Sequence, residues 1–189
     1  MSIFISYYRR KEGKMNTQLK LNKASMKEYT LITDLLIESA KWLKAKGSKQ
    51  WNGILEGKDN HDTKSAIERG DVFYFTKGDA LVGMCILWNK QSSWDQELWG
   101  VDKSDHYFYL HRLAINRHYS GQGIAMEILT EVEKYSKSKG KKEIRLDCIA
   151  DNKVLNALYQ DAGFNFFKTI YQHDAGEQIA DFNLYKLDC

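Results

Sequence analysis

An apolar and aromatic segment that passes through two glycines directly into an amphipathic helix constrains the fold of this chain most. Residues Tyr107–Ile115 read as a strand, Gly121 and Gly123 follow in a short turn, and residues 124–139 carry apolar side chains at helical spacing. Backbone N–H groups converge at such a helix start, where the helix dipole also favours an anion. A side chain at either glycine would block the approach of a phosphate to the backbone. The segment therefore predicts a strand–turn–helix unit with an anion-binding turn.

Periodic segments on both sides of this unit extend the pattern along the chain. Ser25-Met-Lys-Glu28 is a capping box that starts a helix ending near Gly47. Further strands are expected at residues 17–23, 72–76, 80–88, 144–149, 164–171 and 179–187, and further helices at 63–69 and 154–162. The polar stretch 89–105 is expected to form a loop. This order predicts a single α/β domain with a mixed sheet and helices on both faces.

Composition excludes several classes of protein. The chain has 189 residues, of which 43% are apolar, so it can bury a core and is not a disordered segment. Its 28 basic and 25 acidic residues give a formal net charge of +3, too little to indicate a nucleic-acid binder. No apolar run approaches the roughly 18 residues of a membrane span. Three cysteines without metal-ligand spacing suit a reducing compartment. We expect a cytoplasmic protein with no metal, nucleic-acid or membrane partner.

Residues 1–14 stand apart from the predicted domain. Their apolar residues precede their basic ones, which is the reverse of the order in a signal peptide. The codons expected for residues 11–14 form a purine-rich stretch just before the ATG of Met15, as a ribosome-binding sequence would. We therefore expect translation to start at Met15, with 1–14 as an extension and 15–189 as the domain.

Two motifs resemble those of the GNAT superfamily of acyl-CoA-dependent N-acetyltransferases. The run Ser-Gly-Gln-Gly-Ile-Ala at 120–125 is similar to its motif A, Gln/Arg-x-x-Gly-x-Gly/Ala after a strand, except that serine occupies the first position. Residues 152–164, from Asn152 through Tyr159 to Phe164, resemble motif B. The resemblance covers about residues 17–187. It implies a single domain whose central sheet is mostly antiparallel, with two parallel central strands that splay apart.

The resemblance also implies how acetyl-CoA binds as co-substrate. Its pyrophosphate would lie on the backbone amides of the turn, its pantetheine arm would pair along the end of the strand 107–115 beside the strand 144–149, and an asparagine would hydrogen-bond the arm. The cofactor-binding residues implied in this way are Leu113, Ala114, Ile115, Ser120, Gly121, Gln122, Gly123, Ile124, Ala125 and Asn152.

Tyr159 is the candidate general acid. In the resembling family, the tyrosine at this position of motif B donates a proton to the departing thiolate. A thiolate leaving group is helped by a donor within hydrogen-bond reach. Without the motif, the residue would be interpreted as an aromatic side chain of a helix face that packs on the sheet.

His111 is the candidate general base, because an amine must lose a proton before it attacks. The strand around it is similar to the histidine-containing strand of arylalkylamine acetyltransferases, and Tyr109, His111 and Leu113 are expected to share one face. A buried histidine bonded to the backbone is an equal alternative. Asp147 is an alternative base or amine anchor, or the partner of Arg145 or a lysine, and a water molecule is a third possibility for the base. The remaining histidines are expected to be solvated: His61, His106, His118 and His173.

Aromatic residues in the two longest loops suggest an acceptor site for a cationic amine. Trp51, with Tyr109 and Asp147, is the substrate-binding set that we expect; Trp94 and Trp99 could equally cover the core. Cys148 lies within an apolar strand and is expected to pack rather than react.

The sequence thus predicts an enzyme that transfers an acetyl group from acetyl-CoA to a primary amine of a small molecule or peptide. The amine attacks directly within a ternary complex. The alternative is a non-catalytic acyl-CoA-binding or sensing module of the same fold. The acceptor is open, and the protein is expected to be a monomer or a homodimer.

Overall fold

The computed structural model describes residues 18–176 and 178–189. The expected start at Met15 and the extension 1–14 lie outside the described residues. The predicted capping box is present: the Glu28 carboxylate accepts a hydrogen bond from the Ser25 backbone at 2.9 Å, and Ser25 Oγ accepts one from Lys27 N at 3.3 Å. This cap opens a 3-10 turn, η2 (Met26–Glu28), which leads into the long helix α1 (Tyr29–Ala45).

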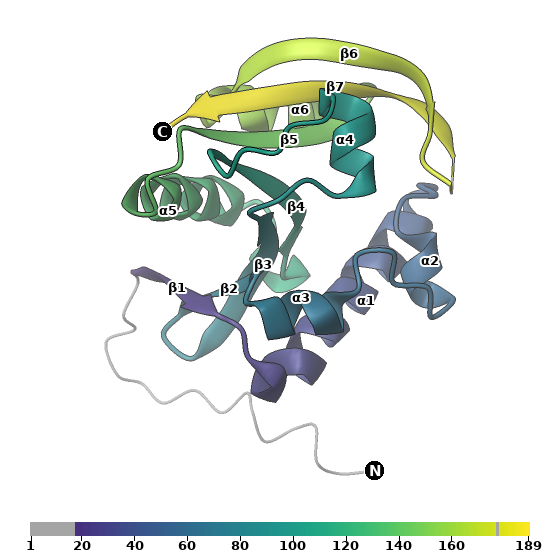
Figure 1. Cartoon of the computed structure of the whole chain (residues 1–189). Helices are drawn as coiled ribbons and strands as arrows, with labels where there is room; N and C mark the ends of the chain where they lie inside the picture. The colour runs from purple at the N-terminus through teal and green to yellow at the C-terminus, as the bar shows by residue number, and fades with distance from the viewer. Residues whose placement is uncertain (1–17, 177) are drawn as a thin grey trace.

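Seven strands of the described chain form one sheet in the order β1-β2-β3-β4-β5-β7-β6 (Figure 1). The strands are β1 (Leu19–Lys23), β2 (Val72–Lys77), β3 (Ala80–Trp88), β4 (Tyr107–Ile115), β5 (Glu143–Ile149), β6 (Asn165–Asp174) and β7 (Ile179–Asp188). Neighbouring strands are antiparallel except for β4 and β5 at the centre, which are parallel. The predicted mixed, mostly antiparallel sheet is therefore confirmed.

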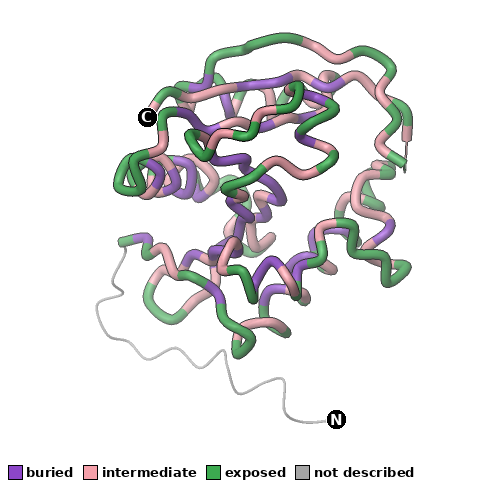
Figure 2. Tube along the Cα trace, in the orientation of Figure 1, coloured by how far each residue is buried: buried purple, intermediate pink, exposed green. Residues whose placement is uncertain are grey.

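Helices cover both faces of the sheet, as the sequence predicted. α5 (Ile124–Ser138) and α6 (Lys153–Asp161) bury their apolar sides in one core cluster with strands β2, β4 and β5. α1 and α3 (Thr63–Arg69) bury theirs in a second cluster with residues of β2, β3 and β4. Figure 2 shows the buried stretches gathered along the sheet and on the inner sides of the helices. The strand β4 lies between both clusters.

The stretch 89–105 is not the continuous loop that the sequence predicted. It contains a short helix, α4 (Ser93–Trp99), which is capped by Ser92 and Asp95 in a second capping box. A four-residue helix, α2 (Asn52–Leu55), lies in the other long connection. Figure 1 shows α4 and α6 on opposite sides of β5 and β7, so α4 covers the face that carries Asp147.

The two parallel strands splay apart after a short paired stretch. β4 and β5 pair from Tyr107 with Glu143 to Tyr109 with Arg145, and within the described residues no pair follows. Beyond this point β4 is bonded along one edge to β3 and leaves its other edge open toward β5. The splayed arrangement implied by the family resemblance is thus present.

A β-bulge in β4 changes which side chains share a face. Ala114 lies opposite Met84 and His111 lies opposite Ile86, so three steps along β4 match two along β3. Arg112 at the bulge has a positive φ of 49°. As a result His111 and Ala114 share one face, whereas Leu113 packs into the cluster on the other. The prediction that 109, 111 and 113 share one face was wrong, because a period of two does not continue through a bulge.

Candidate active site

The turn before α5 presents a set of free backbone amides. A 3-10 turn, η3 (Arg117–Tyr119), leads into Gly121 and Gly123, which both adopt a φ of +76°. Within the described chain, the N–H groups of the turn and helix start that have no hydrogen-bond partner include those of Gly121, Gly123, Ile124 and Ala125. A Cβ atom built on either glycine would meet nothing within 4 Å. The turn is therefore open to a ligand that accepts several N–H bonds.

The other two predicted amides of the turn are already used. Ser120 N donates to Arg117 O at 3.2 Å, and Gln122 N donates to Tyr119 O at 3.3 Å. The Ser120 hydroxyl accepts a hydrogen bond from Arg117, whose guanidinium lies 3.8 Å from the centre of the Trp42 ring. These bonds stabilise the shape of the turn and use none of the free amides of Gly121, Gly123, Ile124 and Ala125.

The strand segment Leu113–Ala114–Ile115 leads from the β4 opening to this turn. Ala114 is buried, while Leu113 and Ile115 are partly exposed and pack against the cluster on the α5 side. The edge of β4 facing β5 is unpaired here, so an extended ligand could bond along it. The predicted cofactor-binding strand and turn therefore form one continuous surface.

Asn152 caps the next helix. Its Oδ1 accepts a hydrogen bond from Leu155 N at 3.1 Å, which gives this side chain a structural role at the start of α6. Its amide nitrogen makes no hydrogen bond within the described residues and can donate to a ligand. The predicted contact with the cofactor arm is compatible with the cap.

Tyr159 lies on α6, on the same face of the sheet as α5. Its side chain is 6% exposed and packs beside the rings of Phe164 and Tyr185. Burial, followed by the negative charges that Cys148 and Asp147 would carry, raises the pKa of the Tyr159 hydroxyl, which therefore keeps its proton. Among the described residues this hydroxyl has no hydrogen-bond partner, although the neighbouring Tyr185 hydroxyl donates to Asn156 at 2.7 Å.

His111 is buried on the opposite face and pairs with a carboxylate. Its Nε2 lies 3.1 Å from Asp95 Oδ1, with side-chain exposures of 6% and 1% respectively. The imidazole packs against the Trp88 ring at 4.4 Å and the His61 ring at 5.4 Å between centroids. His111 is thus neither solvated nor bonded to the backbone through Nε2. Asp95 was missed by the sequence analysis, although Ser92-Ser-Trp-Asp95 has the spacing of a capping box.

Asp147 lies on β5 where the strands separate. Trp94 Nε1 donates to its Oδ1 at 3.0 Å, and burial raises the pKa of the Asp147 carboxyl, an effect that the charge of His111 reduces when the imidazole is protonated. The ion pair with Arg145 or a lysine that the sequence left open is not formed within the described chain. Arg145 instead pairs with Glu143 and donates to the Tyr109 hydroxyl at 3.3 Å.

Tyr109 and Trp51, the other two predicted acceptor residues, make contacts within the protein. Tyr109 is 2% exposed, and its hydroxyl is occupied by Arg145. Trp51 adopts a positive φ of 66° at the start of α2 and packs against the cluster of α1 and α3. Asp147 is the member of the predicted set that interacts electrostatically with His111.

Two of the four histidines predicted to be solvated are not. His61 is stacked on Trp88 at 5.1 Å, and burial lowers its pKa to about 2. His173 pairs with Glu97 and contacts the Trp94 ring edge-on. His106 and His118 are exposed, as predicted. Cys148 is buried, and burial raises the pKa of its thiol to about 12, which agrees with packing rather than reactivity.

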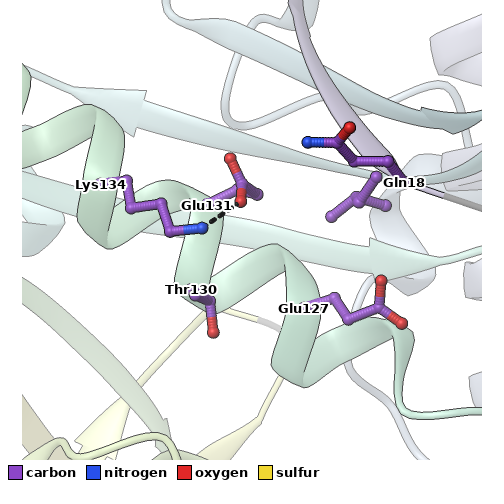
Figure 3. A pocket seen from close by; sticks show the side chains of 6 residues that line it. Gln18, Glu127, Thr130, Glu131 and Lys134 are labelled. Atoms are coloured by element: carbon purple, nitrogen blue, oxygen red, sulfur yellow. Dashed lines mark hydrogen bonds and ion pairs between the residues drawn. The ribbon is translucent and has the colours of Figure 1, made fainter.

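A separate hollow of about 310 Å³ lies between β1 and α5 (Figure 3). It is lined by Gln18, Leu19, Glu127, Thr130, Glu131 and Lys134, none of which is a predicted site residue. Residues 18–176 and 178–189 contain no group of three or more potential metal ligands. In the same part of the chain no helix is long and apolar enough to cross a membrane.

Comparison with known proteins assigns the fold and these motifs to a family. Residues 37–164 match the model of the Acetyltransferase (GNAT) family. The chain belongs to the GNAT family of acetyltransferases. It is 42% identical over 135 residues to the uncharacterized N-acetyltransferase YesJ of Bacillus subtilis, a match that covers 71% of this chain and 75% of YesJ. The predicted family, fold and enzyme class are confirmed.

Solved structures of GNAT proteins have the same fold. A GNAT acetyltransferase from Listeria monocytogenes superimposes with a TM-score of 0.73 at 34% identity, covering 90% of this chain and 95% of that one. RimL, a ribosomal L7/L12 alpha-N-protein acetyltransferase in complex with coenzyme A, superimposes with a TM-score of 0.68 at 15% identity, covering 92% and 96%. The latter likeness concerns the fold alone.

Proposed function

We propose that this protein transfers an acetyl group from acetyl-CoA to a primary amine of a small molecule or peptide, by direct attack within a ternary complex. The observation that carries the proposal is the opening between β4 and β5. The free amides of the 121–125 turn lie at one end of β4, Tyr159 lies on one face of the sheet, and His111 lies on the other. An acid and a base thus approach one opening from opposite sides.

The turn provides the fit for the diphosphate of coenzyme A. The unpartnered N–H groups of the turn, at the positive end of a 15-residue helix, suit an anion with several acceptor oxygens. We place the pantetheine arm along the unpaired edge of β4 at residues 113–115, with Asn152 donating to it from the far side. When bound, acetyl-CoA supplies the activated acetyl thioester.

His111 is the base in this proposal. It removes a proton from the ammonium form of the acceptor, because only the neutral amine has the lone pair needed for attack. Asp147 has one oxygen bonded to Trp94 and its other oxygen free for the amine, so we assign it as the amine anchor. Trp51 and Tyr109 complete the proposed acceptor set as packing residues. A water molecule or Asp147 itself is the alternative base.

Tyr159 is the acid in this proposal. Its hydroxyl is protonated because burial raises its pKa, and no described side chain or backbone group competes for its proton. A donor held in this way can protonate the leaving thiolate without first breaking an internal hydrogen bond. We further propose that the protein acts in the cytoplasm, as a monomer or homodimer; the three free cysteines agree with a reducing compartment.

The experiment is acetyl-CoA turnover with a panel of amines. Free thiol and acetylated product should form together, and only when an amine is present. The panel should include small primary amines, amino acids, aminoglycosides and peptides with free N-termini. Tight binding of acetyl-CoA without thiol release for any amine would instead support the non-catalytic acyl-CoA-binding module.

A further inference from the structure

The carboxylate of Asp95 is the most enclosed charged group beside the proposed reaction site. It is 1% exposed and belongs to the first turn of α4. Its Oδ2 accepts hydrogen bonds from Ser92 N at 2.9 Å and Ser92 Oγ at 2.7 Å, while Ser92 Oγ accepts one from Asp95 N at 3.1 Å. These bonds use Oδ2 and fix the rotamer. The same carboxylate faces His111, whose Nε2 lies 3.1 Å from Oδ1 and 3.3 Å from Oδ2.

This contact determines which nitrogen of His111 can act as a base. An ionised carboxylate only accepts hydrogen bonds, so the nitrogen that faces it must carry a proton. Neutral imidazole has a single N–H, and with that proton on Nε2 the lone pair lies on Nδ1. Nδ1 has no hydrogen-bond partner among the described residues. Its lone pair is therefore free to take a proton from an amine.

Other charged or titratable groups adjoin His111 but do not bond to its ring. Asp147 interacts with it electrostatically from β5, and His61 contacts it ring to ring from the segment before α3. Arg112 follows it on β4 and forms an ion pair of its own. In the described part of the chain, Asp95 is the partner hydrogen-bonded to the imidazole.

We propose that Asp95 is a positioning residue: it holds neutral His111 with its proton on Nε2, so that Nδ1 is the nitrogen that deprotonates the acceptor amine. This inference rests on the proposed acetyl transfer. The proton moves from the amine nitrogen to Nδ1, and Asp95 stabilises the resulting imidazolium without accepting that proton itself. No sequence motif places the two residues together, because the contact joins α4 to β4.

The test compares Asp95→Asn, His111→Ala and the double variant in amine-dependent thiol release. Asparagine can keep the bonds from Ser92, but its NH2 group would donate to Nε2 and move the His111 proton to Nδ1. We expect kcat at neutral pH to fall roughly 10²-fold, the lower range for a positioned base. The KM for acetyl-CoA should be unchanged, and activity should recover at alkaline pH, where the amine is already neutral.

The double variant separates positioning from a structural role. Because Asp95 acts through His111, adding Asp95→Asn to His111→Ala should lower kcat no further. Ser25→Ala is the matched control: it removes the equivalent hydroxyl from the capping box before α1, whose carboxylate, Glu28, does not contact His111. It should lower the melting temperature and leave kcat near the wild-type value.

A second measurement needs no variant to fold. Long-range ¹H–¹⁵N spectra of the wild-type protein should show His111 as the Nε2–H tautomer. An Nδ1–H tautomer, an additive double variant, or a normal pH profile in Asp95→Asn would overturn the inference. If wild-type protein released no thiol with any amine, the proposed function would fail instead, so the two failures are distinguishable.

Discussion

Position 123 favours glycine for two reasons: its backbone has a positive φ, and a side chain there would cover the free amides of the turn. A matched pair of variants separates these two effects. Gly123 begins α5 at a φ of +76°, and a Cβ atom there would meet nothing within 4 Å. Gly140, at the other end of the same helix, has a φ of +68° and equally open surroundings. A valine at either position should cost about the same in stability, roughly 1–2 kcal/mol for a left-handed residue with a side chain.

The two variants should differ sharply in affinity for coenzyme A. At position 123 the side chain would cover the surface formed by the free amides of Gly121, Ile124 and Ala125. A hydrogen bond to a charged group contributes about 1.5–3 kcal/mol. Losing two such bonds would therefore weaken binding by about 3–6 kcal/mol, which corresponds to roughly 10²–10⁴-fold in Kd. Gly140→Val should bind within a few-fold of wild type.

Isothermal titration calorimetry with coenzyme A measures this difference, and urea unfolding checks that the two variants are equally destabilised. Near-wild-type affinity in Gly123→Val would refute the assignment of the turn as the diphosphate site. Equal losses of affinity in both variants would point to a general effect on α5 instead.

Two further predictions concern Tyr159 and His61. Tyr159→Phe should lower kcat roughly 10²–10⁴-fold with little change in stability. The control Tyr185→Phe loses the hydrogen bond to Asn156, so it should lower stability by about 1 kcal/mol and keep turnover. Near-normal turnover of Tyr159→Phe would remove this residue from the mechanism. Because burial lowers the pKa of His61 to about 2, the unfolded chain binds a proton below about pH 6.5 that the folded protein does not. The free energy of unfolding is therefore highest above pH 6.5 and falls as the pH drops, by about 2 kcal/mol between pH 7 and pH 5. His61→Phe should lack this loss in urea unfolding at the two pH values, and an identical loss would contradict the burial of an uncharged His61.

Much of the fold was predictable because local signals and the tertiary structure agree. The capping box at Ser25, the helical apolar face of α1 and the Gly121–Gly123 turn each depend on residues close in sequence. The order of strands and helices then limits the sheet to a few arrangements. The two glycines before the helical segment were also enough to predict where the free amides lie.

The parts of the site that were not predicted depend on packing between distant segments. The bulge at Arg112 moves Leu113 to the opposite face, and nothing in the local sequence alternation indicates it. Asp95 reaches His111 because α4 covers the face of the sheet on which β4 presents the histidine. His61 is buried by stacking on Trp88 from β3. Each contact is set by tertiary structure, which periodicity cannot show.

A crystal structure with bound coenzyme A would show whether the turn before α5 holds the diphosphate. We expect diphosphate oxygens within hydrogen-bond distance of the N–H groups of Gly121, Gly123, Ile124 and Ala125. We also expect the pantetheine arm between β4 and β5, with the sulfur beside the Tyr159 hydroxyl. Phosphates bound elsewhere, for example in the hollow between β1 and α5, or an arm that runs outside the opening, would contradict this placement.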